Sequence, residues 1–170
     1  MKHTVYIALG TNLGDRSANL DSALASLPPA VNIVSSSPVY VTPPWGYLRQ
    51  SSFLNQIVKC ETHLTPEELL DYLKAIEKRM GRKPTFLFGP RTIDLDVLFY
   101  DDLVLETSSL TIPHPRLDER AFVLVPFADL DSDMIHPVSG KSIKELLESV
   151  DTSGVELLQT GSSIQDDSDL

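Results

Sequence analysis

The chain has 170 residues, of which 42% are hydrophobic and 22% charged, and its formal net charge is −10 at pH 7. This length fits one domain, and the acidic balance argues against a nucleic-acid-binding protein, which would carry a basic surplus. A single cysteine excludes a disulfide framework and any site built on paired cysteines. The longest apolar run, residues 121–128, is too short to span a membrane, and no signal peptide precedes the first apolar segment. We therefore expect a cytoplasmic protein without a membrane partner.

Acidic charge is concentrated near the C-terminus. Residues 151–170 hold five acidic residues and no basic residue. From residue 152 onward the sequence is polar and aperiodic, so it offers few apolar groups to offset the entropy lost on ordering. We expect one domain over residues 1–151 and an acidic, flexible tail over residues 152–170.

The first third of the sequence alternates between strand and helix signals. Residues 4–9 predict a buried strand, and residues 10–15 predict a turn. Leucine and alanine at helical spacing then predict a helix that a pair of prolines ends. Two further strands are predicted over residues 31–41 and 53–64.

The clearest helix covers residues 66–80. Thr65 and Glu68 form a capping box, Pro66 suits the first helical position, and Gly81 suits the end of the helix.

Residues 93–99 predict a strand whose apolar face carries four side chains, Ile93, Leu95, Val97 and Phe99. After it we expect a short hairpin near residues 103–105, a helix over residues 118–130 and a final helix capped by Ser142. The order βαββαβ with a C-terminal hairpin and helix predicts an α+β fold. Its core is ferredoxin-like, with a mostly antiparallel sheet and two helices packed on one face.

The strongest candidate for chemistry is the segment of residues 89–96, which reads Gly-Pro-Arg-Thr-Ile-Asp-Leu-Asp. Asp94 and Asp96 lie two residues apart on the predicted strand, so both point away from its apolar face. Adjacent carboxylates repel unless a cation lies between them, and Mg²⁺ binds one or two carboxylates together with phosphate oxygens and water. Arg82 and Arg91 precede the pair and suit phosphate neutralisation. The alternative is a solvent-facing pair on an edge strand, since Asp-x-Asp alone is weak evidence for a metal site.

More candidate phosphate ligands follow downstream. His114 lies between two prolines in a loop, where functional groups are often presented, and Arg116 and Arg120 follow it. A structural histidine is the alternative explanation. Residues 140–142 resemble the end of a P-loop but lack its upstream glycine, so any ATP site is not a P-loop.

A second group of residues suits a flat ligand that forms hydrogen bonds along one edge. Residues 41–46 form a loop stiffened by two prolines, and Asn55 places an amide in an otherwise apolar strand. An amide both donates and accepts, which complements the edge of an aminopyrimidinone ring. The aromatic residues that would enclose such a ring are Trp45, Phe53, Phe88 and Phe122. Taken singly, each aromatic is better explained by core packing. For Asn55 the alternative is a hydrogen bond to neighbouring backbone.

Together these segments resemble the 6-hydroxymethyl-7,8-dihydropterin pyrophosphokinase family of folate biosynthesis. The resemblance covers residues 4–150. It rests on segments that occur in the same order, namely residues 7–14, 40–44, 53–55, 77 with 81–82, 89–96 and 113–122.

The resemblance implies transfer of pyrophosphate from ATP to the hydroxymethyl group of the pterin, with release of AMP and with two Mg²⁺ ions bound by Asp94 and Asp96. It assigns catalysis to Arg82, Arg91, Asp94 and Asp96. It places around ATP the residues Glu77, Arg82, Arg91, Val97, His114 and Arg120. It assigns to the pterin pocket Thr42, Pro43, Trp45, Phe53, Asn55, Phe88 and Phe122.

Some residues depart from that family's usual pattern. The segment after Arg82 contains fewer arginines, and Ser109 stands where a basic residue is common. We expect residues 82–88 to act as a lid that closes over ATP, with closure weaker than is usual for the family. We also expect a monomer whose partners are its small-molecule substrates.

A function of another class remains open at this point. A non-catalytic ferredoxin-like module that binds a small ligand would explain the fold, but not the combination of paired aspartates, arginines and an amide pocket. An RNA-binding sheet would need basic flanks around exposed aromatics, which the acidic balance opposes.

Overall fold

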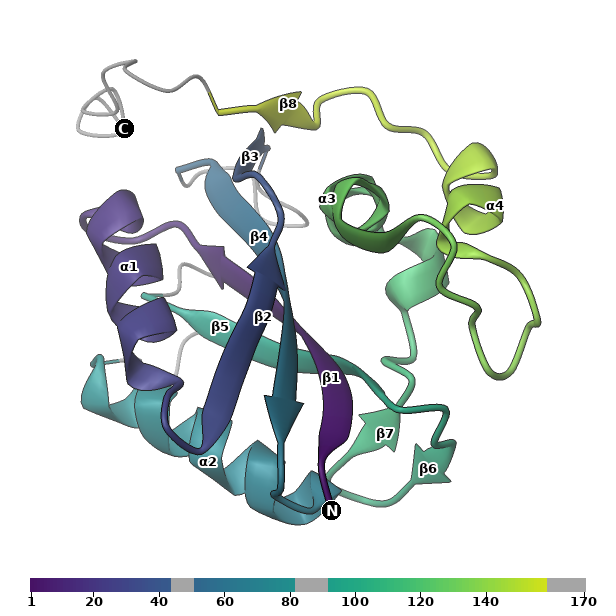
Figure 1. The fold of residues 1–170 in the computed structure, drawn as a ribbon. Helices are drawn as coiled ribbons and strands as arrows, with labels where there is room; N and C mark the ends of the chain where they lie inside the picture. The colour runs from purple at the N-terminus through teal and green to yellow at the C-terminus, as the bar shows by residue number, and fades with distance from the viewer. Residues whose placement is uncertain (44–50, 82–91, 159–170) are drawn as a thin grey trace.

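A computed structural model describes residues 1–43, 51–81 and 92–158. Its centre is a six-stranded sheet in the order β5-β1-β4-β3-β8, with β2 also paired to β4 (Figure 1). The three long strands are β1 (His3–Thr11), β4 (Phe53–Thr62) and β5 (Asp94–Tyr100). β1 lies between the other two and is antiparallel to both. The mostly antiparallel α+β architecture predicted from the sequence is therefore confirmed.

The strand predicted over residues 31–41 is in fact two strands. β2 (Val31–Ser36) and β3 (Tyr40–Thr42) both pair with β4, and residues 37–39 separate them. The hydroxyl of Ser37 accepts a hydrogen bond from the backbone N–H of Ile57 at 2.9 Å. Pro38 has no backbone N–H to donate, which explains why regular pairing stops there.

Two helices cover one face of the sheet. α1 (Arg16–Ser26) and α2 (Pro66–Arg79) pack their apolar residues against β1 side chains such as Val5 and Ile7. The predicted capping box of α2 is present, with Thr65 and Glu68 exchanging hydrogen bonds.

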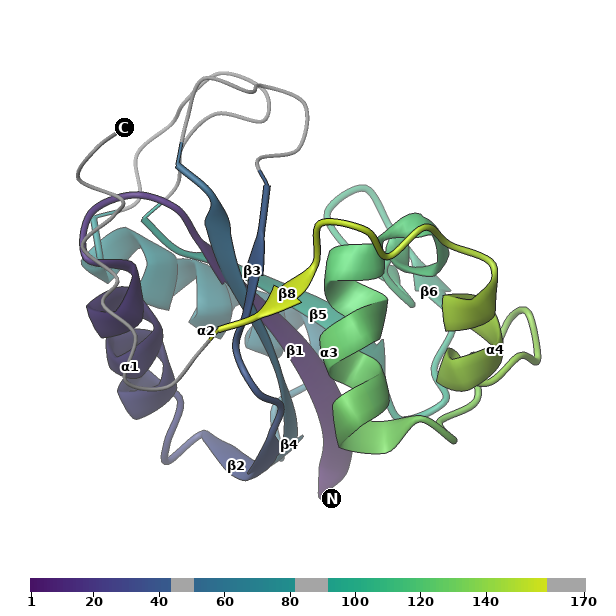
Figure 2. The ribbon, with the colours of Figure 1, turned by 90° about the horizontal axis from the view of Figure 1, so that it is seen from above.

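The opposite face is also covered, by the C-terminal part of the chain (Figure 2). A hairpin of β6 (Leu105–Glu106) and β7 (Thr111–Ile112) leads to the 3-10 helix η1 (Leu117–Glu119), α3 (Ala121–Asp131) and α4 (Ile143–Glu148). α3 and α4 form a second apolar cluster with Tyr6 and Phe99 of the sheet. The additional C-terminal hairpin and helices predicted from the sequence are present and turn a two-layer core into three layers, but the hairpin joins residues 105–106 to residues 111–112 instead of lying at residues 103–105.

A β-bulge in β5 changes the face on which Phe99 lies. Tyr6 pairs with Phe99 but Ile7 pairs with Val97, so Leu98 is an extra residue on β5. Val97 contributes to the cluster under α1 and α2, whereas Phe99 contributes to the cluster under α3 and α4. Our expectation of Phe99 and Val97 on one face was therefore wrong, because a bulge reverses the alternation of side chains.

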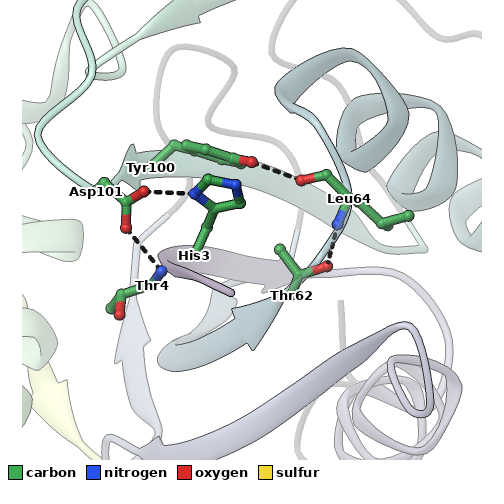
Figure 3. Close-up of polar contacts among 6 residues, drawn as sticks. All are labelled: His3, Thr4, Thr62, Leu64, Tyr100 and Asp101. Atoms are coloured by element: carbon green, nitrogen blue, oxygen red, sulfur yellow. Dashed lines mark hydrogen bonds and ion pairs between the residues drawn. The ribbon is translucent and has the colours of Figure 1, made fainter. Parts of the chain in front are cut away.

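A polar cluster closes the end of β1 where the chain starts (Figure 3). Asp101 accepts a hydrogen bond from the backbone N–H of Thr4 at 2.8 Å and pairs with the ring of His3 at 2.7 Å. Tyr100 donates to the carbonyl oxygen of Leu64 at 2.6 Å, which ties β5 to the end of β4. These bonds fix one end of the central strands.

The predicted tail includes a strand. Glu156–Leu157 form β8, which pairs with Tyr40 and Val41 of β3. Part of the segment that we expected to be flexible is therefore a strand, because a short strand can be ordered by an open sheet edge without apolar periodicity of its own. The domain boundary at residue 151 stays a prediction. Residues 159–170 lie outside the described part of the chain. Among the described helices, none combines the length and apolar character needed to cross a membrane.

Candidate active site

A pocket opens on the α3 side of the sheet, at the end of β1 remote from the cluster of Figure 3. At this end Gly10 stands opposite Asn55 on β4 and opposite Asp94 on β5. The predicted pterin-binding and metal-binding residues are therefore held on neighbouring strands. The pocket is lined by Ala8, Leu9, Gly10, Thr42, Pro43, Phe53, Asn55, Ile57, Asp94, Asp96, Leu98, His114, Arg120, Phe122 and Val123.

Gly10 gives the pocket its floor. A Cβ atom built on Gly10 would lie 3.2 Å from the side-chain oxygen of Asn55 and 3.9 Å from the ring of Phe53. A side chain at this position would thus press on the oxygen of Asn55, whereas its distance from Phe53 is that of an ordinary van der Waals contact. From the sequence we interpreted residues 10–15 as a turn, but β1 continues to Thr11, and only the register of three strands reveals the contact.

The amide of Asn55 is buried and oriented. Its nitrogen donates to the hydroxyl of Thr42 at 2.7 Å, and both side chains are almost inaccessible to solvent. The amide oxygen, a hydrogen-bond acceptor, lies on the side of Gly10. Pro43, Phe53 and Phe122 line the same pocket, so the structure brings together five of the predicted pterin residues.

Asp94 and Asp96 both line the pocket and are both partly exposed. The hydroxyl of Thr11 donates to the carbonyl oxygen of Thr92 at 2.5 Å, which joins β1 to the backbone just before the aspartates. Among residues 1–43, 51–81 and 92–158, no group of three or more histidine, cysteine, aspartate or glutamate side chains could hold a metal ion. A pair of carboxylates fits a hard cation such as Mg²⁺, which takes its remaining ligands from water and phosphate oxygens.

His114 is held in a neutral state beside these aspartates. Burial and, to a lesser extent, the nearby guanidinium of Arg120 together lower the pKa of His114 to about 4, although Asp94 opposes the change. Its Nδ1 accepts a hydrogen bond from the backbone N–H of Arg116 at 3.3 Å. The proton of the neutral ring is therefore on Nε2, which makes that atom a donor.

Arg120 supplies positive charge to the same pocket. Burial lowers its pKa, and the neighbouring carboxylate of Asp96 opposes that shift, so the guanidinium stays cationic at neutral pH. Its Cζ atom lies 5.4 Å from the ring centroid of Phe122. Arg120 thus contacts the aromatic wall while lining the space beside the aspartates.

The aromatic side chain of Phe122 belongs to α3, and two tyrosines of the sheet hold that helix in place. The hydroxyl of Tyr6 donates to Asp131 at 2.6 Å, and the hydroxyl of Tyr40 donates to Asp129. Burial, reinforced by Asp129, raises the pKa of Tyr40 to about 12, so the phenol keeps its proton at neutral pH. Both bonds fix the C-terminal half of the helix whose first turn holds Phe122.

The loop that enters β4 is held from the opposite side. Asn12 donates from its side-chain nitrogen to the carbonyl oxygen of Ser51 at 3.1 Å, and Arg16 donates from Nη1 to the carbonyl oxygen of Ser52 at 2.9 Å. These are the two residues before Phe53. The sequence analysis missed both side chains, since neither belongs to a pattern that indicates their partners.

Two predicted nucleotide residues lie beneath the pocket. Glu77 is buried on α2, and its Oε2 accepts a hydrogen bond from the backbone N–H of Leu95 at 2.7 Å. Val97 packs in the cluster under α1 and α2, on the face of β5 opposite the aspartates. Neither side chain lines the pocket, so a direct contact with the nucleotide stays a prediction.

The model of one family, 7,8-dihydro-6-hydroxymethylpterin-pyrophosphokinase, matches residues 6–132. This match spans most of the chain and includes β4, β5 and the part of β1 from Tyr6 onward. The chain belongs to the 7,8-dihydro-6-hydroxymethylpterin-pyrophosphokinase family.

Relatives with known names support the assignment to the pyrophosphokinase family. A 2-amino-4-hydroxy-6-hydroxymethyldihydropteridine pyrophosphokinase from Aquifex aeolicus is 42% identical, over 84% of this chain and 89% of its own length. The protein of the same name from Methylorubrum extorquens is 40% identical, over 91% of this chain and 98% of its own length. A folic acid synthesis protein of Schizosaccharomyces pombe is 41% identical over 89% of this chain, which spans only 21% of that protein.

Solved structures support the pyrophosphokinase fold. A crystal structure of HPPK-DHPS in complex with substrates matches this chain with a TM-score of 0.71 and 17% identity, over 88% of this chain and 43% of that one. A Plasmodium falciparum HPPK-DHPS structure has the same TM-score and identity, over 87% of this chain and 45% of its own. At this identity the likeness concerns the fold alone. The family and the ferredoxin-like α+β core predicted from the sequence are thus confirmed, and a non-catalytic module is not favoured.

Some predicted site residues of this pyrophosphokinase lie outside the described part of the chain. They are Trp45, Arg82, Phe88 and Arg91, and the segment predicted to be a lid lies there too. Their roles stay predictions.

Proposed function

We propose that this chain transfers the pyrophosphoryl group of ATP to the hydroxyl of 6-hydroxymethyl-7,8-dihydropterin, in a reaction that requires Mg²⁺ and releases AMP. The observation that carries the proposal is that one pocket is lined both by groups suited to a flat, hydrogen-bonding ring and by charged groups suited to phosphates and metal. The amide of Asn55 with aromatic walls forms one part, and Asp94 and Asp96 with Arg120 form the other. Membership of the pyrophosphokinase family supports the same reaction.

The acceptor binds in the part of the pocket formed by β3, β4 and the start of α3. Because Thr42 takes one donor of the Asn55 amide, the orientation of that amide is fixed before a ligand arrives. Its oxygen then accepts from a ring N–H of the pterin, and Phe53 and Phe122 contact the faces or edges of the ring. A buried amide discriminates strongly against rings that lack the matching polar edge, because its polar atoms would then lose their partners.

The phosphates bind toward β5. Arg120 contributes a cationic fork that matches phosphate oxygens, and the neutral ring of His114 contributes an N–H from Nε2. We propose that Arg82 and Arg91 add positive charge from the adjoining segment. Phosphoryl transfer relies mainly on positioning and on charge stabilisation, which these groups provide.

We propose that Asp94 and Asp96 hold the Mg²⁺ ions, two in number. When bound, the metal neutralises phosphate charge and favours the in-line arrangement of acceptor and leaving oxygens. The protein's own contribution is a pair of carboxylates on one face of β5, fixed between β1 and the Glu77 hydrogen bond to Leu95.

The test is an assay of nucleotide products with ATP, the reduced pterin and Mg²⁺. We expect AMP and the pterin pyrophosphate in equal amounts, and no AMP when the metal is chelated. Asp94→Asn and Asp96→Asn should each lose most of the activity while remaining folded, because an amide cannot neutralise Mg²⁺.

Asp102→Asn is the matched control, since this aspartate is exposed in the turn after β5 and should keep full activity. Formation of ADP would contradict pyrophosphoryl transfer. Normal turnover of both Asp94→Asn and Asp96→Asn would contradict the metal assignment.

A further inference from the structure

Residues 152–158 cross from the α3 and α4 layer to the edge of the sheet, and we call them the C-terminal strap (Figures 1 and 2). Within the strap, Glu156 pairs with Val41 and Leu157 pairs with Tyr40. The backbone N–H of Leu158 then donates to the carbonyl oxygen of Val39 at 2.9 Å. The strap is thus joined by backbone pairing to Tyr40 and Val41 of β3 and to Val39 just before it, and Thr42 follows directly after these paired residues.

A tight turn aims the strap at Pro43. Asp151 accepts hydrogen bonds from the backbone N–H of Ser153 at 2.9 Å and from its hydroxyl at 2.7 Å. Gly154 follows with a φ of 87°, a backbone conformation that favours glycine. A Cβ atom on Gly154 would lie 3.4 Å from two ring carbons of Pro43, so the strap backbone packs directly against that ring.

A second pocket lies beside the acceptor site, and the strap together with the residues just before it lines part of it. Residues 149–151, 153 and 155 form one wall of it, and Thr42, Pro43, Arg120 and Phe122 form part of the remainder. Those four residues line the main pocket as well. Thr42 and Pro43 therefore separate the strap from the space in which the pterin is proposed to bind.

β3 needs such support. It has only three residues, and its other pairing partner is β4. A strand so short, paired on one side, gains few hydrogen bonds to offset its ordering entropy. Yet it ends in Thr42, whose hydroxyl fixes the Asn55 amide.

We infer that the C-terminal strap is a positioning element for the acceptor half of the active site, because it holds Thr42 and Pro43 where the pterin binds. This inference rests on the proposed function. The strap lies at the sheet edge opposite β5, which carries the aspartates. Its loss should therefore weaken binding of the pterin and leave binding of ATP nearly unchanged.

Two truncations test the inference. A chain that stops after Asp151 loses the strap, and a chain that stops after Leu158 loses only the residues beyond it. We expect the first to raise the KM for the pterin about tenfold, the scale of losing one or two hydrogen bonds, with the KM for ATP within about twofold of the full chain. The second should match the full chain in both constants.

A point variant covers the case in which the shorter chain does not fold. Leu158→Pro removes the N–H that bonds to Val39 but keeps the strap, and we expect the same selective rise in the pterin KM of about threefold to tenfold. Glu156→Gln is its control, because it keeps the backbone and changes only an exposed side chain.

Amide hydrogen exchange supplies a readout that does not depend on activity. We expect the N–H groups of residues 40–42 to exchange faster in Leu158→Pro than in Glu156→Gln. An unchanged pterin KM in Leu158→Pro, or equal rises in the KM for pterin and for ATP, would overturn the inference. Failure of the full chain to form AMP would instead overturn the proposed function, and the exchange rates would still decide whether the strap orders β3.

Discussion

The carboxylate of Glu77 accepts a hydrogen bond from the backbone N–H of Leu95 at 2.7 Å, between the two aspartates of the candidate site. β5 lies at one edge of the described sheet, so its outward N–H groups require partners from outside the sheet. Glu77 comes from α2, and its side chain is only 8% exposed. A buried glutamate thus fixes the backbone on which Asp94 and Asp96 stand.

Removing this acceptor should affect both stability and catalysis. Glu77→Leu leaves the Leu95 N–H buried without its carboxylate, so we expect a loss of about 1–3 kcal/mol in the free energy of unfolding and a fall in turnover. Glu77→Gln keeps an acceptor oxygen and should lose less of both. Denaturant unfolding and the AMP assay measure the two effects, and Asp71→Leu on the exposed side of α2 is the control. Full turnover in Glu77→Leu would show that β5 holds its shape without this bond.

Features encoded locally could be predicted from the sequence, whereas features set by strand register could not. Thr65 and Glu68 signal the start of α2 because both partners of the capping box lie within one turn. Phe99 was assigned to the wrong face because the bulge at Leu98 depends on pairing with β1.

The residues of the candidate site also fall into those that the sequence reveals and those that only strand register reveals. Asp94, Asp96 and Asn55 stand out because polar side chains interrupt apolar strands. Gly10 could not be recognised as part of the pocket, since its importance follows from a 3.2 Å approach to a residue far away in sequence. The strap was missed for the same reason, because the order of residues 156–157 comes from β3.

The Asn55–Thr42 pair leads to a prediction of substrate selectivity. Asn55→Ala removes the hydrogen-bonding edge of the pocket, so we expect the pterin to bind about 10- to 100-fold more weakly and ATP to bind normally. Thr42→Val should weaken pterin binding less, because it frees the amide to rotate without removing it. Calorimetry with the pterin measures these changes, and Asn32→Ala on an exposed position of β2 is the control. A double variant no weaker than Asn55→Ala would confirm that the two side chains act through one another.

The neutral state of His114 leads to a prediction of pH dependence. Its folded pKa of about 4 lies below the ordinary value of 6.5, so the unfolded chain binds more protons between these values. The free energy of unfolding should therefore fall as the pH drops from about 6.5, and the full loss of stability should be reached below about pH 4.

Comparison with a variant isolates this contribution from the acidic groups that titrate over the same range. Between pH 7 and pH 4 we expect His114→Gln to lose about 1–3 kcal/mol less stability than the unmodified protein, as measured by denaturant unfolding. The exposed His63 provides the control, since His63→Gln should follow the unmodified protein. Identical pH profiles for all three proteins would show that His114 is not held neutral.

Arg16 leads to a prediction about how the loop before β4 is held. As the first residue of α1, its cation faces the positive end of the helix dipole, and the residue is only 4% exposed. Both placements are unfavourable for a cation unless specific hydrogen bonds compensate for them. One such bond runs from Nη1 to the carbonyl oxygen of Ser52, directly before Phe53 of the pocket.

We therefore expect Arg16 to act on the acceptor site rather than on the nucleotide. Arg16→Met keeps much of the side-chain volume but removes the donors, and it should raise the KM for the pterin about tenfold while the KM for ATP changes less than about twofold. Arg16→Lys keeps the charge and a hydrogen-bond donor, so its KM for the pterin should lie between those of Arg16→Met and the unmodified protein. Lys74→Met, which removes a charge from an exposed position of α2, should leave both constants unchanged. If Arg16→Met instead lowered the melting temperature with no selective change in the pterin KM, the arginine would serve only the stability of α1, because a group that positions Phe53 must affect the ligand that Phe53 contacts.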